Sequence, residues 1–255
     1  MKSISSIFAA AVLFSTLAAA ADNYSLWPRR PAELEQARRL IAEQKGGEAV
    51  HLILPYLAEN GIAGREARRI AAAVNVPRYL SRLHPQARVY TVQRGDTLIK
   101  IAATEKCPAD LLMLLNGIVE PSGLKVGQKL VLVPMELRME IHPRQRELCV
   151  WHGDMLVADY DLTAVEGMQK THYGETEISA REGYGQGGAK LPARSFQYLS
   201  SDRRLVLGNG VVLAGEQGGS GAVLRLHAAD LNELTLLLGV GAAVTISDTE
   251  TQPGK

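Results

Sequence analysis

Residues 89–134 carry the pattern that most constrains how this chain folds. Residues 89–93 alternate apolar and polar side chains as a half-buried strand does, and residues 131–133 form a second short apolar stretch. Between them, residues 98–102 and 109–116 place leucine, isoleucine and alanine three or four positions apart, which is the spacing of one helix face. The order strand, helix, helix, strand predicts a compact unit with short connections.

The residues between these elements favour turns and helix ends. Gly95 turns the chain after the first strand, and Asp96 or Thr97 can cap the following helix by accepting hydrogen bonds from its free amide groups. Asn116 and Gly117 end the second helix, because both residues tolerate the left-handed conformation. The apolar stripe of the second helix is expected to comprise Leu111, Leu114 and Leu115.

The whole pattern resembles the lysin motif (LysM), a small module that holds N-acetylglucosamine polymers such as peptidoglycan. In that family the sugar lies in a shallow groove between the first strand–helix loop and the loop after the second helix. The resemblance implies a glycan site with Gly95, Asp96, Thr97 and Leu98 on one wall and Asn116, Gly117 and Ile118 on the other. Leu98 and Ile118 are expected to offer apolar contact. The alternative is that these residues only build the turns and caps.

The last part of the chain carries a second set of motifs. Residues 138–151 read as a hairpin, residues 155–162 as its return strand and residues 241–246 as a closing strand, with a helix after the Leu-Arg-Leu of 224–226. Together with Thr-His-Tyr-Gly at 171–174, these stretches resemble the L,D-transpeptidase catalytic domain, the YkuD-type fold that crosslinks peptidoglycan stem peptides. The resemblance implies a mostly-β domain.

This second resemblance fails at the residues that would do the chemistry. The family's motif is Ser-x-Gly-Cys-Ile/Val-Arg, preceded by a His-Gly whose histidine activates the cysteine. In this chain Val223 stands at the cysteine position and Ala214 at the histidine position. Acyl transfer by this route needs a thiolate and a base, and a valine side chain supplies neither. We therefore predict a domain without catalytic residues.

Three polar residues remain candidates for a retained peptide cleft: His172, Ser220 and Arg225. His172 replaces the family's proline in the substrate-side loop. Ser220 lies near the expected centre, but no histidine matches the role of a base that could activate it. Arg225 is as well explained by pairing with a backbone carbonyl or a carboxylate.

The segment before the LysM-like unit has a helical pattern. Residues 34–41 mark an amphipathic helix stopped by glycines 46–47, and residues 49–59 mark a second helix. Residues 66–74 mark a third and residues 77–83 a short fourth helix. We expect two stacked helical hairpins, whose arginine pairs at 38–39 and 68–69 face solvent. A scaffold that binds a partner enzyme is one alternative role for this segment.

The first residues have the composition of a secretion signal. Lys2 supplies a positive end, residues 7–17 an apolar core, and residues 19–21 small side chains for cleavage before Asp22. No cysteine stands at that junction, so we expect no lipid or other membrane anchor after cleavage. A net charge of +1 without a basic stripe argues against nucleic-acid binding. The expected location is the periplasm or the exterior, in association with the cell wall.

Two cysteines leave two interpretations open. In an oxidising compartment Cys107 and Cys149 could form a disulfide between the LysM-like unit and the next domain, or each could be a small buried hydrophobic residue. The six histidines are scattered without the paired spacing of metal ligands. No phosphate-binding loop is found, so we expect neither a metal nor a cofactor.

The sequence therefore predicts a multidomain α+β protein. Its parts are a signal peptide (1–21), helical hairpins (22–88), a βααβ LysM module (89–134), a degenerate L,D-transpeptidase-like domain (135–247) and a disordered tail (248–255). The predicted function is an exported, non-catalytic protein that binds peptidoglycan glycan strands, with stem peptides or an envelope protein as further partners. The alternative is an active L,D-transpeptidase or hydrolase with a non-standard nucleophile.

Overall fold

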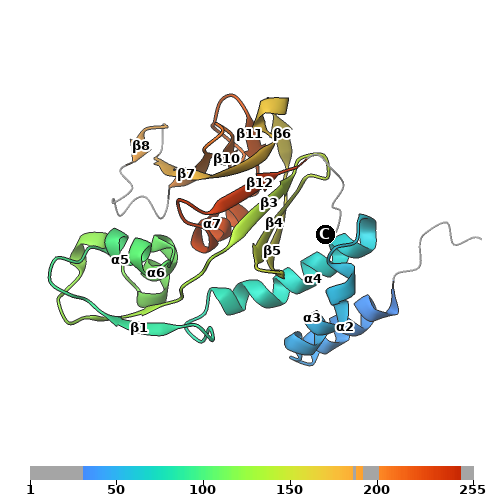
Figure 1. Ribbon diagram of the computed structural model, residues 1–255, viewed down its shortest axis with the longest axis horizontal. Coiled ribbons are helices and arrows are strands. Elements are labelled where there is room, and N and C mark those ends of the chain that lie inside the picture. Colours follow the sequence, from blue (N-terminus) through green and yellow to red (C-terminus); the bar gives the residue numbers. More distant parts are fainter. Residues whose placement is uncertain (1–30, 186–187, 192–200, 248–255) are drawn as a thin grey trace, which may run out of the picture.

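The computed structural model describes residues 31–185, 188–191 and 201–247. The chain forms a LysM-like unit at one end, a group of helices at the other end and a large sheet above and between them (Figure 1). The predicted signal peptide (1–21) and the predicted tail (248–255) lie outside the described residues. None of the helices in the described ranges is both long and apolar enough to cross a membrane.

The N-terminal helices are α2 (Ala32–Ala42), α3 (Gly46–Ile53) and α4 (Gly61–Tyr79), with a 3-10 turn η2 (Leu54–Tyr56) between the last two. Glycines 46 and 47 begin α3, so the prediction that they stop a helix was wrong. The turn is made by Gln44, whose φ is 63°. A Cβ at Gly46 would lie 2.8 Å from Val74 Cγ1, so glycine is needed here for the close packing of α3 on α4.

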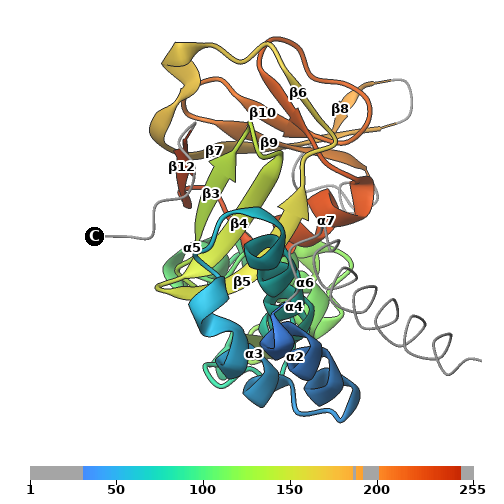
Figure 2. The same cartoon turned by 90° about the vertical axis from the view of Figure 1, so that its right-hand side faces the viewer.

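Helix α4 does not belong to a second hairpin. It continues through Pro77 to Tyr79, so the predicted fourth helix does not exist as a separate element. Proline removes one backbone hydrogen bond, but burial of Val76 and Tyr79 holds the last turn in place. The α2–α3 hairpin packs on α4, and α4 lies against strand β5 (Met155–Asp161) of the large sheet (Figure 2). The packing partner of the third helix is therefore the sheet.

The LysM-like unit has the predicted βααβ order. Strands β1 (Arg88–Thr91) and β2 (Lys129–Leu132) pair antiparallel around helices α5 (Leu98–Thr104) and α6 (Ala109–Asn116), with a 3-10 turn η3 (Pro121–Gly123) before β2. Leu111 and Leu115 are buried as expected, whereas Leu114 is 55% exposed. Helix α6 packs on α5 and on helix α7 (Ala228–Leu237), which buries Leu112 and Met113 and leaves Leu114 facing out.

The C-terminal domain is built on one long mixed sheet. Its strands follow the order β5-β4-β3-β12-β7-β9-β10-β11-β6, and β8 pairs with β7 at the side. In Figure 2 the part around β3, β4 and β5 stands above the helices, and β9, β10 and β6 lie across the top. The remaining strands and turn are β3 (Arg138–His142), β4 (Glu147–His152), β6 (Ala164–Glu166), η4 (Lys170–His172), β7 (Gly174–Tyr184), β8 (Lys190–Leu191), β9 (Asp202–Leu207), β10 (Val212–Ala214), β11 (Val223–Arg225) and β12 (Ala243–Ile246).

The LysM-like unit and the sheet share one apolar core. Leu111 and Leu112 of α6 belong to the same buried cluster as Leu231 and Leu234 of α7. At this junction the buried carboxylate of Asp110 pairs with two arginines of the sheet, Arg181 and Arg203. Both guanidinium groups also donate to Thr235 of α7. The LysM-like unit is thus packed onto the sheet and is not connected to it by a flexible linker alone.

Candidate functional sites

The first wall of the predicted glycan groove is a tight turn. Gly95 is exposed and has a φ of +86°, a conformation that favours glycine. Asp96 Oδ2 accepts hydrogen bonds from the Gln93 amide and from the Tyr90 hydroxyl, both at 2.7 Å. These bonds hold the pKa of the Asp96 carboxyl below its usual value, with the Gln93 amide as the main cause. Thr97 caps α5 by accepting a hydrogen bond from the Lys100 amide at 3.2 Å.

The structure places Leu98 differently from the expectation. Its side chain is 2% exposed and packs in the core with Ile101 and Ala102. A leucine in this position cannot offer its apolar surface to a sugar, so that part of the prediction was wrong. The physical reason is that Leu98 is the first residue of a short amphipathic helix and belongs to its buried face.

The second wall ends helix α6. The Asn116 side-chain amide donates to the Leu112 carbonyl at 2.8 Å and to the Val131 carbonyl at 2.6 Å, and its Oδ1 accepts from the Val131 amide at 2.7 Å. Asn116 therefore ties α6 to β2, which is the structural alternative left open for this residue. Gly117 has a φ of +60° and forms the left-handed end of the helix, and Ile118 is half-buried against the core.

Both walls are anchored to the same strand region. Val92, just before the first wall, exchanges backbone hydrogen bonds with Gly127 and Gln128 at 2.9 Å each, whereas Asn116 bonds to Val131. The first anchor point lies just before β2 and the second lies within it. The structure thus fixes the two predicted walls relative to each other through β2.

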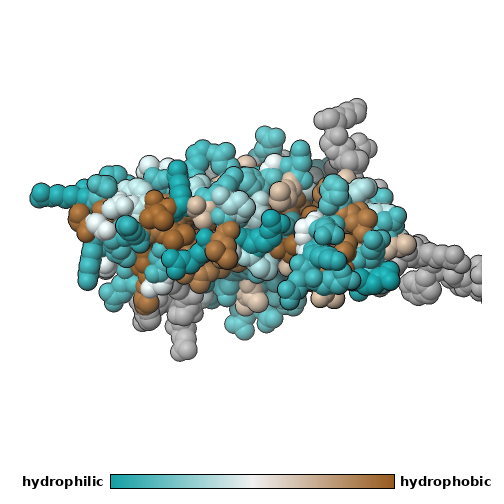
Figure 3. Space-filling model, turned by 90° about the horizontal axis from the view of Figure 1, so that it is seen from below, coloured by the Kyte–Doolittle hydropathy of each residue, from teal (hydrophilic) through white to brown (hydrophobic). Residues whose placement is uncertain are grey.

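Two apolar residues near the second wall were not predicted. Leu114 is 55% and Val119 is 53% exposed, on either side of Asn116, Gly117 and Ile118 in the chain. Figure 3 shows apolar side chains on both halves of the lower face, most extensively on the half that carries the LysM-like unit. The sequence held a signal for Leu114, because a run of five apolar residues from 111 to 115 cannot lie entirely on one face of a helix.

The positions expected for the transpeptidase cysteine and histidine lie on neighbouring strands, two residues apart in register. Val223 begins β11 and Ala214 ends β10, and these two strands pair in parallel. Val223 is 1% exposed and Ala214 is fully buried. A Cβ at Gly219 would lie 3.1 Å from Val223 Cγ2 and 3.9 Å from the Ala214 Cβ. Both apolar side chains therefore lie close to Gly219, in the loop of residues 215–221.

One arginine, Arg225, is bonded to this loop, and a second, Arg204, lies against it. Arg225 Nη1 donates to the carbonyls of Gly215 and Gly218 at 3.0 Å each, and its other nitrogens pair with both oxygens of Glu166. This pairing lowers the pKa of the Glu166 carboxyl. Arg204 stacks over the Tyr184 ring at 3.7 Å, and a Cβ at Gly218 would fall 1.9 Å from its Nη2. Arg225 Nη1 thus bonds to the loop of residues 215–221, called the covering loop below.

None of the three candidates for a peptide cleft lines either of the two hollows found beside helix α5. Ser220 is exposed on the covering loop. His172 lies in η4, where its Nδ1 accepts from the Gln169 amide at 3.0 Å and its carbonyl accepts from the Asn209 side chain. The bonded partners of His172 and those of Arg225 have no residue in common. In the described part of the chain, no imidazole is hydrogen-bonded to Ser220.

The two cysteines are free and buried. Cys107 packs in the core shared by the LysM-like unit and the sheet, whereas Cys149 packs in the cluster under the N-terminal helices. The structure thus has two buried thiols and no disulfide between them, because each side chain faces a different core. Burial raises the pKa of Cys107 to about 11 and that of Cys149 well above its usual value. Neither thiol is suited to form the thiolate that a nucleophile needs.

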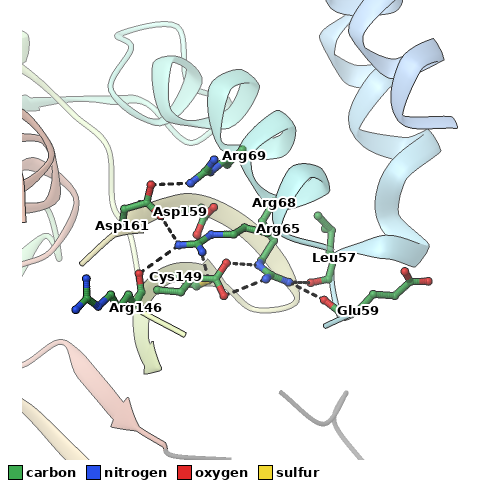
Figure 4. A network of polar contacts seen from close by, with 10 residues as sticks. Leu57, Glu59, Arg65, Arg68, Arg69, Arg146, Cys149, Asp159 and Asp161 are labelled. Carbon is green, nitrogen blue, oxygen red and sulfur yellow. Dashed lines mark hydrogen bonds and ion pairs between the residues drawn. The ribbon is translucent and has the colours of Figure 1, made fainter. Parts of the chain in front are cut away.

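A buried polar network joins α4 to the sheet (Figure 4). Arg68 is 4% exposed and pairs with both oxygens of Glu147, at 2.8 and 2.9 Å. Its remaining nitrogen donates to the carbonyls of Leu57 and Glu59. The prediction of a solvated arginine pair was therefore wrong for Arg68, whose burial depends on a carboxylate 79 residues away in the chain.

The same network contains a set of potential metal ligands. One ligand atom from each of Glu147, Cys149 and Asp159 lies within 4.8 Å of the other two. Both Glu147 oxygens already accept from Arg68, so an ion would have to displace the guanidinium group. Burial raises the pKa of Asp159 to about 7, and the neighbouring Glu147 adds to this effect. The arrangement is a hydrogen-bonded ion pair beside a protonatable carboxyl.

Comparison with known proteins identifies one of the two domains. Residues 90–133 match the LysM domain family. A segment of 44 residues is 52% identical to an uncharacterised lipoprotein, YgeR, of Escherichia coli strain K12; it covers 17% of this chain and 18% of that protein. The chain therefore contains a LysM domain, and it spans less than a fifth of the relative's length.

Solved structures similar to this chain include L,D-transpeptidases. The enzyme of Xylanimonas cellulosilytica (residues 123–326) is 15% identical with a TM-score of 0.32, over 62% of this chain and 97% of that one. An L,D-transpeptidase of Mycobacterium smegmatis is 13% identical with a TM-score of 0.32, over 48% and 64%. Protein Bd1075 of Bdellovibrio bacteriovorus is 15% identical with a TM-score of 0.33, over 45% and 48%. Scores this low carry no argument about the chemistry of this chain.

Proposed function

We propose that this protein is an exported, non-catalytic peptidoglycan-binding protein of the bacterial cell envelope. LysM domains bind peptidoglycan, and the match at residues 90–133 is the observation that carries the proposal. The glycan, a polymer containing N-acetylglucosamine, would lie between the turn at Gly95–Thr97 and the helix end at Asn116–Ile118. Exposed Leu114 and Val119 would supply the apolar contact first expected from Leu98.

We further propose that the C-terminal domain does not catalyse acyl transfer. The two positions that the motif resemblance assigns to nucleophile and base hold Val223 and Ala214, both buried. Acyl transfer needs a nucleophile and a group that deprotonates it within hydrogen-bond reach. Arg225 is bonded to the Gly215–Gly221 loop near this point, and Arg204 lies against Gly218. The domain would instead serve as a surface for a peptide or a protein.

The glycan-binding part is tested by co-sedimentation of the full chain with purified sacculi at low salt. Substitution Leu114→Gln should lower the bound fraction severalfold, because it removes apolar surface beside the groove. Leu83→Gln is the matched control, since Leu83 is 91% exposed and lies outside the LysM domain. Wild-type protein that stays in the supernatant would overturn the proposal.

The non-catalytic part is tested with muropeptides that carry tetrapeptide stems. Incubation with the full chain should leave their mass spectrum unchanged. New crosslinked or trimmed species would instead support the alternative, an L,D-transpeptidase or hydrolase with a non-standard nucleophile. Ser220→Ala would then show whether the one exposed hydroxyl of the covering loop is responsible.

A further inference from the structure

The connector between α4 and the LysM domain is held by one buried side chain. It comprises residues 80–87, between the end of α4 and the start of β1 (Figure 1). Of residues 81–86, only His84 is buried, at 9% exposed, whereas the neighbouring Leu83 is 91% exposed. The connector thus exposes its leucine and buries its imidazole, which is the reverse of the usual distribution. Its attachment therefore depends on a group that can gain a proton near neutral pH.

His84 packs against the end of helix α4 and, through it, against the β4–β5 hairpin. The ring centroids of His84 and Tyr79 lie 4.8 Å apart. The Tyr79 hydroxyl lies 2.8 Å from His152 Nδ1 and 3.7 Å from Met155 Sδ. His152 and Met155 face each other across the hairpin turn. The imidazole of His84 therefore attaches the connector to α4 and, through Tyr79, to the sheet.

The hydrogen bonds of the connector determine which protonation state of His84 it accepts. His84 Nδ1 accepts a hydrogen bond from the Gln86 amide at 3.2 Å. A backbone amide can only donate, so Nδ1 carries a lone pair and the proton of the neutral ring lies on Nε2. A second proton would have to bind Nδ1, where it would face the Gln86 N–H. Protonation therefore replaces this hydrogen bond with a contact between two donors.

The groups around His84 also oppose a positive charge on it. Helix α4 contributes Tyr79 and the cation Arg78, and strand β4 contributes His152. Burial is the main reason why the pKa of His84 lies below its ordinary value, and the positive charges of His152 and Arg78 lower it further. The neutral ring is thus the form that fits this place.

A hollow of about 400 Å³ beside the connector gives water access to this cluster, because His152 lines it. The other charged residues of its lining are Arg88, Lys106 and Glu136. The two cations are already paired, Arg88 with Glu105 and Lys106 with Glu136. Neither carboxylate is therefore free to pair with an imidazolium group of the connector.

We propose that His84 is a proton-sensitive anchor, which holds the connector on α4 and the β4–β5 hairpin when neutral and releases it when protonated. The anchor is complete above about pH 6.5, the ordinary pKa of histidine, and weakens as the pH falls below that value. The release is local, because Asp110 keeps the LysM domain on the sheet through Arg181 and Arg203. The chain that enters β1 thus becomes mobile in acid while the shared core stays folded, and this does not depend on glycan binding.

The test uses a thiol-reactive fluorophore on Leu83→Cys, at a position that is 91% exposed. The two native thiols are buried, so the introduced thiol is labelled selectively. Time-resolved anisotropy from about pH 7.5 to about pH 4.5 measures the mobility of the connector. The fraction of the anisotropy that decays within nanoseconds should at least double below about pH 6.5. It should stay constant when His84→Gln is added, because glutamine offers the Gln86 amide an acceptor and takes up no proton.

A matched control carries the fluorophore on Val126→Cys, which is 70% exposed in a turn of the LysM domain. Its mobility should not change over this pH range. An equal change at both positions would mean general unfolding and would overturn the proposal.

Imidazole nitrogen NMR of the unlabelled wild type is an independent measurement, with the His84 signal assigned by its loss in His84→Gln. At about pH 7.5 the ring should be neutral with its proton on Nε2. It should gain the second proton over the pH range in which the connector becomes mobile. Protonation without release, a release that persists in His84→Gln, or no release down to about pH 4.5 would each contradict the anchor.

Discussion

The LysM domain and the C-terminal sheet relate fold to function in opposite ways. In the LysM domain the predicted recognition residues are also the turn and cap residues: Asp96 closes the first loop, and Asn116 ties α6 to β2. In the sheet, the two positions that the motif assigns to catalysis hold Val223 and Ala214, which contribute only packing. A binding groove built from turn and cap residues persists as long as the domain folds. A catalytic side chain, by contrast, can be replaced while the fold remains.

This difference explains why one resemblance is complete and the other is not. A buried valine and alanine in place of a thiol and an imidazole leave no polar group to satisfy at the strand ends. The replacement therefore carries no folding penalty of its own, and the covering loop can close over it. A comparable loss at Asn116 would leave the Val131 amide and carbonyl without their side-chain partner.

The largest expected effect tests whether the two regions fold as one unit. Asp110→Ala would leave Arg181 and Arg203 without their shared carboxylate at a buried junction. We expect the free energy of unfolding to fall by about 3–5 kcal/mol, the usual result of removing one partner of a buried pair. Hydrogen exchange measured by mass spectrometry should show LysM and sheet peptides losing protection at the same denaturant concentration.

The control for this substitution is Glu216→Ala on the exposed covering loop, which should change stability by less than about 0.5 kcal/mol. If LysM peptides instead lose protection at much lower denaturant than sheet peptides, the LysM domain is an independent module. The comparison would then be between two separate domains and not between two parts of one core.

The pH dependence of stability should also differ between the two regions. The raised pKa of Asp159, about 7, means that the folded chain binds a proton more tightly than the unfolded one. Its contribution to stability therefore decreases as the pH rises from about 4 to about 7. Asp159→Asn should remove this slope and raise the free energy of unfolding at pH 8 by about 2 kcal/mol, since it abolishes a desolvated charge.

In the LysM domain the contribution of Asp96 to stability should change with pH in the opposite direction. The lowered pKa of Asp96 means that its contribution is present above the ordinary pKa of an aspartate and is lost as the pH falls through the folded value, below 3.8. Urea unfolding of wild type, Asp159→Asn and Asp96→Asn from pH 3 to pH 8 checks both directions. A wild-type stability that rises between pH 4 and pH 7, with a slope unaltered in Asp159→Asn, would contradict the first.

The sequence predicted those elements that local signals determine. The βααβ unit, the β3–β4 hairpin and the cap by Thr97 follow from periodicity and turn chemistry within a few residues. The burial of Arg68 could not be read locally, and the apolar run 111–115 indicated that some of its residues face out without showing that Leu114 is one of them. The burial of Arg68 depends on Glu147 and the exposure of Leu114 on α7, and both partners are distant in the chain.

The candidate site was predictable to a similar extent. Motif spacing placed Val223 and Ala214 at neighbouring positions, and the structure has them on paired strands. The bonds that commit Arg225 to the covering loop and His172 to η4 form only when the sheet folds. The hollow beside α5 has no sequence signal, because its lining comes from stretches that lie far apart in the chain, from Leu98 to Ala243.

A matched pair of glycines tests the central contrast. Gly117 and Gly221 both have positive φ, of 60° and 84°, with open space where a Cβ would stand. Replacing either by alanine should cost about 1 kcal/mol of stability, since both positions need a left-handed φ. Only Gly117→Ala should also weaken sacculus binding severalfold, because it lies in the glycan wall. Equal sacculus binding by Gly117→Ala and Gly221→Ala would contradict the proposed difference between the LysM domain and the C-terminal sheet.

A small effect on stability and none on activity are expected where the catalytic cysteine would be restored. Val223→Cys is nearly isosteric and should change the free energy of unfolding by less than about 1.5 kcal/mol. The new thiol would lie buried beside Ala214 under a loop that Arg225 holds, with no imidazole to deprotonate it. It should react with a thiol reagent only after unfolding, and the variant should leave tetrapeptide muropeptides unchanged. Rapid labelling of the introduced thiol in the folded chain would show that the loop opens readily, so that Val223 alone, and not its covering, separates this domain from an enzyme.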